Sequence, residues 1–171
     1  CGPRRAASRL RELVETGKAA GILFGRERSG LTNEELSLAD EILRGGLDVL
    51  TGCDRTDTSK LAAIGHCFGG TMALELARGG SPLAAVVGFH SGLATARPDD
   101  ASAITGKVLV CIGAEDPLIP AQQRVDFETE MRAGGVDWRM NLYGGAAHSF
   151  TNPDAGALGV PGIEYHELTN Q

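Results

Sequence analysis

The stretch from Leu61 to Gly70 reads Leu-Ala-Ala-Ile-Gly-His-Cys-Phe-Gly-Gly and contains the pattern Gly-x-Cys-x-Gly. The apolar residues before the pattern predict a buried strand, and the residues from about Thr71 to Arg78 predict a helix. A nucleophile between such a strand and helix stands on a sharp turn, and glycines two residues to either side leave room for the backbone. A chance pattern in a chain with 24 glycines is the alternative, but the flanking elements favour the turn.

The cysteine of this pattern, Cys67, has surroundings that activate a thiol for nucleophilic attack. The helix after it directs the partial positive charge of its N-terminus at the sulfur, which favours the thiolate and lowers the pKa from about 8.5. The backbone N–H of Phe68 is one expected donor to the oxyanion of a tetrahedral intermediate. We therefore predict a nucleophilic cysteine at this turn.

The rest of the chain alternates between apolar runs typical of buried strands and segments with helical periodicity. Unbroken apolar strands separated by helices are typical of a parallel sheet covered on both faces. We therefore expect a single α/β domain over residues 1–171, with a mostly parallel sheet of about five strands and helices on both faces. The expected strands are 19–24, 61–64, 84–89, 107–113 and 138–143, and the expected helices are 3–16, 32–50, 71–78 and 121–132.

A cysteine nucleophile needs a histidine base and an acid that orients it, and in such sheets the order along the chain is nucleophile, acid, histidine. Asp116 follows a later strand and His148 follows the last one, so we expect both at the carboxyl ends of strands, where ligands bind in such sheets. Glu115 is the rival carboxylate, but Pro117 favours Asp116 because it ends the strand there. An aspartate before a proline is also common in turns, which is the structural alternative for Asp116.

The other three histidines have weaker claims to a catalytic role. His66 is held beside the cysteine and is interpreted as structural, and His166 lies in a polar tail where we expect it to face solvent. His90 ends a strand and is expected to line the pocket. Ser149, next to His148, is expected to line it as well.

Charge and composition exclude several other classes of protein. The 171 residues have a net charge of −6, which argues against a DNA or RNA binder, and no apolar stretch is long enough for a membrane span. The four cysteines form no CxxC pair or metal-ligand spacing, so we expect no metal site; Cys111 is expected to be a small buried hydrophobe. The N-terminus shows no signal-peptide pattern, so we expect a cytoplasmic protein with free thiols.

Three stretches of the chain carry a resemblance to a known family: Ala62-Ala-Ile-Gly-His-Cys-Phe-Gly-Gly, Gly113-Ala-Glu-Asp-Pro-Leu-Ile-Pro and Tyr143-Gly-Gly-Ala-Ala-His-Ser-Phe-Thr-Asn-Pro. On these stretches, the chain from about Leu43 onward resembles the dienelactone hydrolase family of α/β-hydrolases. The resemblance implies a truncated α/β-hydrolase-like fold with Cys67 as nucleophile, His148 as base and Asp116 as its partner. It also implies a carboxymethylenebutenolidase-type reaction, in which a lactone or small ester acylates the thiolate and water then releases the acid.

The N-terminal segment contains the stretch Gly21-Ile-Leu-Phe-Gly-Arg-Glu-Arg-Ser-Gly-Leu-Thr-Asn-Glu-Glu. On this stretch, residues from about 5 to 42 resemble a different family, the SPOUT-class RNA ribose methyltransferases. The stretch Gly21–Glu35 looks like the glycine-rich motif with which that family binds S-adenosylmethionine, but the later motif that completes its knot is absent. We therefore expect no cofactor and place methyl transfer last among the functions. The chain is interpreted as two unrelated α/β pieces joined between about Asp40 and Gly46.

A weak hydrolase of lactones or small esters is the first functional hypothesis, because the family's N-terminal strands are replaced in this sequence. An inactive folded scaffold, from a chimera or a fragment, is the alternative. Missing covering helices leave apolar sheet surface, so we also expect self-association into a homo-oligomer.

Overall fold

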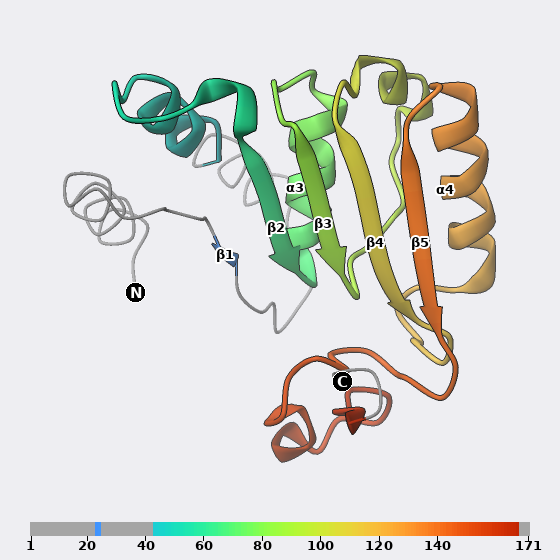
Figure 1. Cartoon of the computed structure of the whole chain (residues 1–171). Helices are drawn as coiled ribbons and strands as arrows, with labels where there is room; N and C mark the ends of the chain where they lie inside the picture. The colour runs from blue at the N-terminus through green and yellow to red at the C-terminus, as the bar shows by residue number, and fades with distance from the viewer. Residues whose placement is uncertain (1–22, 25–42, 168–171) are drawn as a thin grey trace.

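The structure is a computed structural model, and it describes residues 23–24 and 43–167. Its centre is a five-stranded sheet in the order β1-β2-β3-β4-β5, in which every neighbouring pair of strands is parallel (Figure 1). The parallel α/β sheet predicted from the sequence is confirmed, and the last two strands have the predicted bounds. The strands are β1 (Leu23–Phe24), β2 (Ala62–His66), β3 (Ala85–Phe89), β4 (Lys107–Gly113) and β5 (Trp138–Tyr143).

Two long helices connect the strands. The helix α3 (Phe68–Arg78) follows β2, and α4 (Ala121–Ala133) joins β4 to β5. The helix α3 begins earlier than predicted, because the two glycines of its first turn have low helix propensity and hide its start in the sequence. Three short 3-10 helices lie in the connections: η1 (Thr58–Lys60), η2 (Pro98–Ala103) and η3 (Ala155–Leu158).

The predicted N-terminal helices fall mostly on residues that the structure does not describe. The helix expected over residues 3–16 and the first part of the one expected over 32–50 lie there, as do residues 19–22 of the first expected strand. Residues 43–51 are helical, and the helix includes the pair Gly45–Gly46 despite the low helix propensity of glycine. Within the described residues, no helix is long and apolar enough to cross a membrane.

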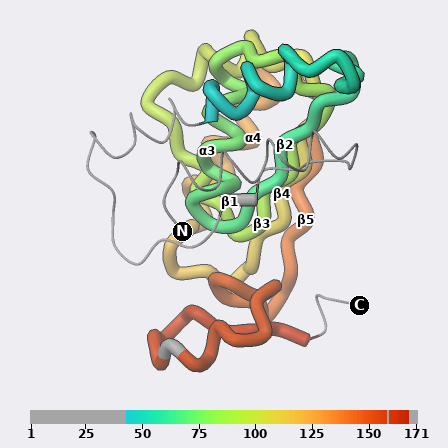
Figure 2. Tube along the Cα trace, turned by 90° about the vertical axis from the view of Figure 1, so that its left-hand side faces the viewer, coloured from blue at the N-terminus to red at the C-terminus, as the bar shows by residue number. Residues whose placement is uncertain are grey.

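The main hydrophobic core lies between the sheet and the two long helices. Side chains alternate between the two faces of a strand, and one alternate set faces α3 and α4. Both helices therefore pack on the same face of the sheet, as the two views of the chain also show (Figures 1 and 2). The most deeply buried members of this core are Leu74, Val86, Val110, Ile112, Phe127 and Met131.

The opposite face of the sheet is only partly covered by the described residues. Ile64 is 41% exposed on this face, and its neighbours in register, Val87 and Leu109, are half-buried. Near the carboxyl ends of the strands, the segment after β5 closes this face through a small second core of Cys111, Ala146 and Phe150. Helices on both faces were expected, but in the described residues the two long helices cover one face. Self-association through the open face stays a prediction.

Candidate active site

Cys67 stands on a strained turn between β2 and α3. Its backbone has φ 52° and ψ −124°, a combination that side chains rarely adopt, and its N–H donates to the carbonyl oxygen of Phe89 at 2.9 Å. A Cβ atom at Gly65 would collide with the backbone of Gly69 and Gly70, so the turn can form only with glycine at that position. The prediction of a strand-to-helix turn that needs a glycine before the cysteine is confirmed.

The thiol of Cys67 lies at the N-terminus of α3 and is partly exposed. The carbonyl oxygen of Cys67 accepts hydrogen bonds from the backbone N–H groups of Gly70 and Thr71, which fixes the first turn of the helix. The N–H of Phe68 belongs to the first residue of the helix, so it has no acceptor one turn earlier within α3. An anion or a developing negative charge at this point is stabilised by the helix end.

His148 joins the thiol to a buried carboxylate. Its Nε2 lies 3.2 Å from Cys67 Sγ, and its Nδ1 lies 2.7 Å from Asp116 Oδ2. The other carboxylate oxygen of Asp116 accepts the backbone N–H of Leu118 at 2.9 Å. Both His148 and Asp116 are 4% exposed, so the contact between imidazole and carboxylate is shielded from water. The three residues that the sequence predicted in this order are brought into one continuous chain of contacts.

The rival carboxylate, Glu115, does not reach this chain of contacts. Its side chain is exposed, and its backbone N–H donates to the carbonyl oxygen of Ala146 at 3.0 Å. The strand β4 ends at Gly113, three residues before Asp116, so the turn that follows the strand carries Asp116 to the site. The structure therefore selects Asp116 over Glu115, although Pro117 does not mark the end of the strand as expected.

A second segment of the chain holds the backbone of His148. The N–H of His148 donates to the carbonyl oxygen of Gly162 at 2.9 Å, and its own carbonyl oxygen accepts from the N–H of Glu164 at 3.0 Å. His148 and Ile163 form an isolated parallel bridge. Gly162 has φ 79°, which favours glycine. This glycine was the one sequence feature that could have pointed to a turn of the tail against His148. Sequence reasoning missed this support.

The protonation of His148 follows from its two partners. Burial alone would lower its pKa, but hydrogen bonds to Asp116 and Cys67, together with their negative charges, outweigh burial and raise the pKa to about 9. The ring is therefore protonated at neutral pH. An imidazolium beside a thiolate is the arrangement in which a cysteine attacks a carbonyl carbon without first transferring a proton.

Two further histidines lie beside this chain of contacts. His90 is 3% exposed, has φ 41°, and its ring meets that of His148 edge-on at 4.7 Å between centroids. The hydroxyl of Thr151 contacts both His90 Nε2 at 3.3 Å and His66 Nδ1 at 3.1 Å. Burial, followed by the charges of His148 and His66, lowers the pKa of His90 to about 3, so His90 is neutral. His66 also stacks on Phe89 at 4.8 Å, in agreement with a structural role.

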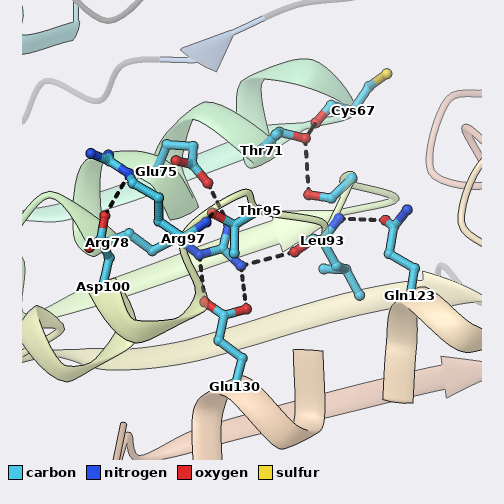
Figure 3. Close-up of polar contacts among 11 residues, drawn as sticks. Cys67, Thr71, Glu75, Arg78, Leu93, Thr95, Arg97, Asp100, Gln123 and Glu130 are labelled. Carbon is cyan, nitrogen blue, oxygen red and sulfur yellow. Dashed lines mark hydrogen bonds and ion pairs between the residues drawn. The ribbon is translucent and has the colours of Figure 1, made fainter. Parts of the chain in front are cut away.

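The loop that carries His90 is tied to both long helices. The hydroxyl of Thr71 on α3 donates to the carbonyl oxygen of Gly92 at 3.1 Å. The carbonyl oxygen of Leu93 accepts from Arg78 Nη2 at 2.9 Å, and its N–H donates to the side chain of Gln123 on α4 at 2.7 Å (Figure 3). Arg78 is itself fully buried and forms two hydrogen bonds of 2.7 Å with Glu130. The loop after β3 is thus anchored at consecutive residues.

The remaining predicted residues are placed as follows. Ser149 is 6% exposed with φ 61°, so it is buried next to His148. Cys111 is a buried thiol, as expected, and burial raises its pKa. His166 is half-buried and its backbone N–H donates to the carbonyl oxygen of Phe150 at 3.1 Å, so the expectation that it faces solvent is wrong.

Within the described ranges, one group of side chains has the composition of a metal site. Cys67, His90 and His148 each place one ligand atom within 4.8 Å of the others. No sequence pattern indicated this group, because its members follow three different strands and have no regular spacing. The expectation of no metal site rested on spacing alone and did not consider residues that the fold brings together.

The comparisons with known proteins agree with this geometry. A sequence model described as the dienelactone hydrolase family matches residues 26–170. The solved structure of a dienelactone hydrolase-like promiscuous phosphotriesterase from metagenomic libraries is 42% identical, has a TM-score of 0.72, and covers 80% of this chain and 57% of its own. A second solved structure, m3DLH, is 47% identical with a TM-score of 0.73 and the same coverage. An uncharacterized protein of Caenorhabditis elegans is 31% identical over 72% of this chain and 79% of its own length.

The extent of these matches bears on the N-terminal segment. The chain spans a little over half the length of the two solved proteins. The family match begins at residue 26, so it includes residues 26–42 and extends across the join expected between Asp40 and Gly46. The matches found do not support the resemblance of residues 5–42 to RNA methyltransferases.

Proposed function

Because this chain belongs to the dienelactone hydrolase family, we propose that it hydrolyses a lactone or small ester through an acyl group carried on Cys67. The observation that supports this function best is the position of His148, whose two ring nitrogens lie 3.2 Å from the thiol of Cys67 and 2.7 Å from the carboxylate of Asp116. A nucleophile, a base and an orienting acid in one line are the parts that acyl transfer requires.

The proposed reaction has two halves. In the first, the Cys67 thiolate attacks the carbonyl carbon, and the bond to the leaving oxygen breaks as His148 gives that oxygen its proton. The product is an acyl thioester on Cys67 and an alcohol, which in a lactone remains part of the acyl chain. In the second half, His148 takes a proton from water, the resulting hydroxide attacks the thioester, and the acid leaves while the thiolate is restored.

Asp116 and the start of α3 have supporting roles in this proposal. The carboxylate of Asp116 holds the ring of His148 in one orientation and stabilises its charged form. The N–H of Phe68 stabilises the oxyanion of each tetrahedral intermediate, and removal of one such donor in other hydrolases costs about 100- to 1000-fold in rate. His90 and Ser149 lie beside His148 and are proposed to line the pocket.

Turnover of p-nitrophenyl acetate by the wild-type chain and by Cys67→Ala tests the proposal. We expect the variant to lose the catalysed release of p-nitrophenol, while Cys53→Ala, a change at a cysteine outside the site, should retain it. Equal rates for wild type and Cys67→Ala would contradict the catalytic role and favour the alternative of an inactive folded scaffold. A neutral p-nitrophenyl phosphotriester is a suitable second substrate, because a similar structure is named as a promiscuous phosphotriesterase.

A further inference from the structure

Cys67 and His148, the proposed nucleophile and base, have a third potential metal ligand beside them, His90. A thiolate and two imidazoles are the donor set that Zn²⁺ prefers in proteins. Catalysis as proposed above uses the Cys67 sulfur and the ring of His148, but it assigns no chemistry to the ring of His90. His90 Nδ1 is buried and has no hydrogen-bond partner among the described residues.

The distances suit a tetrahedral ion. Zinc bonds of about 2.3 Å to sulfur and about 2.0–2.1 Å to nitrogen place donor atoms about 3.3–3.6 Å apart at the tetrahedral angle. Cys67 Sγ and His148 Nε2 are already 3.2 Å apart, and one ring nitrogen of His90 lies within 4.8 Å of both. A rotation of the His90 side chain that shortens its distances by about 1 Å completes three ligands. The fourth position is left for water.

A second shell of the kind found at zinc sites is also present. His148 Nδ1 contacts Asp116 at 2.7 Å, which is the carboxylate–histidine pairing that orients metal ligands in proteins. The loop that carries His90 is anchored through Gly92 and Leu93 to both long helices, so this ring is presented from a fixed backbone. The backbone that carries His90 is therefore held in place before the ion arrives, and only the side chain of His90 has to rotate.

We propose that Cys67, His90 and His148 bind one Zn²⁺ ion, and that this ion inhibits the enzyme. The ion takes the thiolate of Cys67 and the Nε2 lone pair of His148, and the proton that these two groups share passes to the solvent. Neither group is then available to attack a substrate or to transfer a proton. Inhibition rests on the proposed function, whereas zinc binding does not.

Zinc binding is measured first, without reference to turnover. Cys1 lies outside the described residues, so it is replaced by Ser to remove its thiol as a zinc ligand. This chain then competes for Zn²⁺ with a chromophoric chelator, in a buffer whose reductant carries no thiol. We expect one equivalent of zinc per chain. Loss of an outer-shell partner costs about 10- to 100-fold in metal affinity, so loss of a direct ligand in His90→Gln should cost at least about tenfold. The matched change His166→Gln, at a histidine outside the group, should leave the affinity unchanged.

The coordination and the inhibition are measured next. X-ray absorption of the zinc-loaded wild type should show one sulfur at about 2.3 Å and nitrogen ligands at about 2.0–2.1 Å, and this readout holds even if His90→Gln fails to fold. Zinc should suppress p-nitrophenyl acetate turnover, and a chelator should restore it. The His90→Gln variant, measured against its own metal-free rate, should need at least tenfold more zinc for the same fractional inhibition.

Several results would overturn the site. They are the absence of stoichiometric zinc, a zinc environment without sulfur, or a folded His90→Gln that binds zinc as tightly as the wild type. If the chain proves inactive on esters, the function proposed above fails, yet zinc competition and X-ray absorption still decide whether the metal site exists.

Discussion

The buried ion pair between Arg78 and Glu130 gives a prediction whose magnitude follows from the structure. The two side chains are 1% and 4% exposed and share two hydrogen bonds of 2.7 Å, so neither charge can be hydrated in the folded chain. Replacement of the arginine in Arg78→Met leaves the carboxylate of Glu130 buried without its partner. Breaking one side of such a pair costs about 3–5 kcal/mol, which for a chain of this size lowers the melting temperature by roughly 6–20 °C.

The double variant Arg78→Met/Glu130→Met tests the reasoning behind this number. Buried ion pairs replaced by apolar groups of similar volume are often neutral or even stabilising, because both desolvation costs disappear. We therefore expect the double variant to be only about 1–2 kcal/mol less stable than the wild type, a loss that comes from the hydrogen bonds of Arg78 to the Leu93 carbonyl and to Glu75.

Urea unfolding followed by tryptophan fluorescence measures both variants. The chain has a single tryptophan, Trp138 on β5, and its ring meets Phe127 of α4 edge-on at 5.9 Å, so its emission reports the packing of helix on sheet. A double variant as unstable as Arg78→Met would refute the argument. Such a result would mean that the ion pair stabilises the fold more than apolar side chains of similar volume do.

Three further outcomes are expected at the site. Because the pKa of His148 is raised to about 9, its imidazolium should persist through neutral pH, so kcat/KM for p-nitrophenyl acetate should fall as the pH rises through about 9. Asp116→Asn should move this fall to lower pH, and a fall that does not move would contradict the role of the carboxylate. Iodoacetamide at neutral pH should alkylate Cys67 before Cys111, whose pKa is raised by burial, and peptide mass spectrometry would expose the reverse order. Gly65→Ala should lower kcat at least about tenfold, because displacements of about 1 Å in an active site cost about 100-fold; full activity in the folded variant would show that the turn tolerates a Cβ.

The local part of the fold could be predicted from the sequence. The apolar run of β4 and the alternating apolar residues of β5 predicted both strands at their observed bounds, because either pattern can be recognised without knowing which strands are neighbours. The start of α3 was missed because its glycines are there for close packing: a Cβ at Gly70 would collide with the side chain of Ser91. Propensity rules describe the helix itself, not the space around it.

The candidate site could be predicted only where its residues directly follow strands, because the order of the strands along the chain is also their order in the sheet. That order indicated Cys67, Asp116 and His148, and the structure brings these three together. The support of His148 by Gly162 depends on a contact between irregular segments that carry no periodic signal. The approach of His90 to His148 likewise depends on which strand ends are neighbours and on the positive φ of His90, which local sequence does not reveal.

The most direct test of the central claim is to isolate the acyl group during turnover. The chain is mixed with p-nitrophenyl acetate, quenched in acid after a few turnovers, digested, and analysed by mass spectrometry. The account predicts one acetyl group, bound as a thioester to the peptide that contains Cys67, and none on that peptide in Cys67→Ala. An unmodified Cys67 in a chain that is still releasing p-nitrophenol, or an acetyl group carried by another residue, would contradict it.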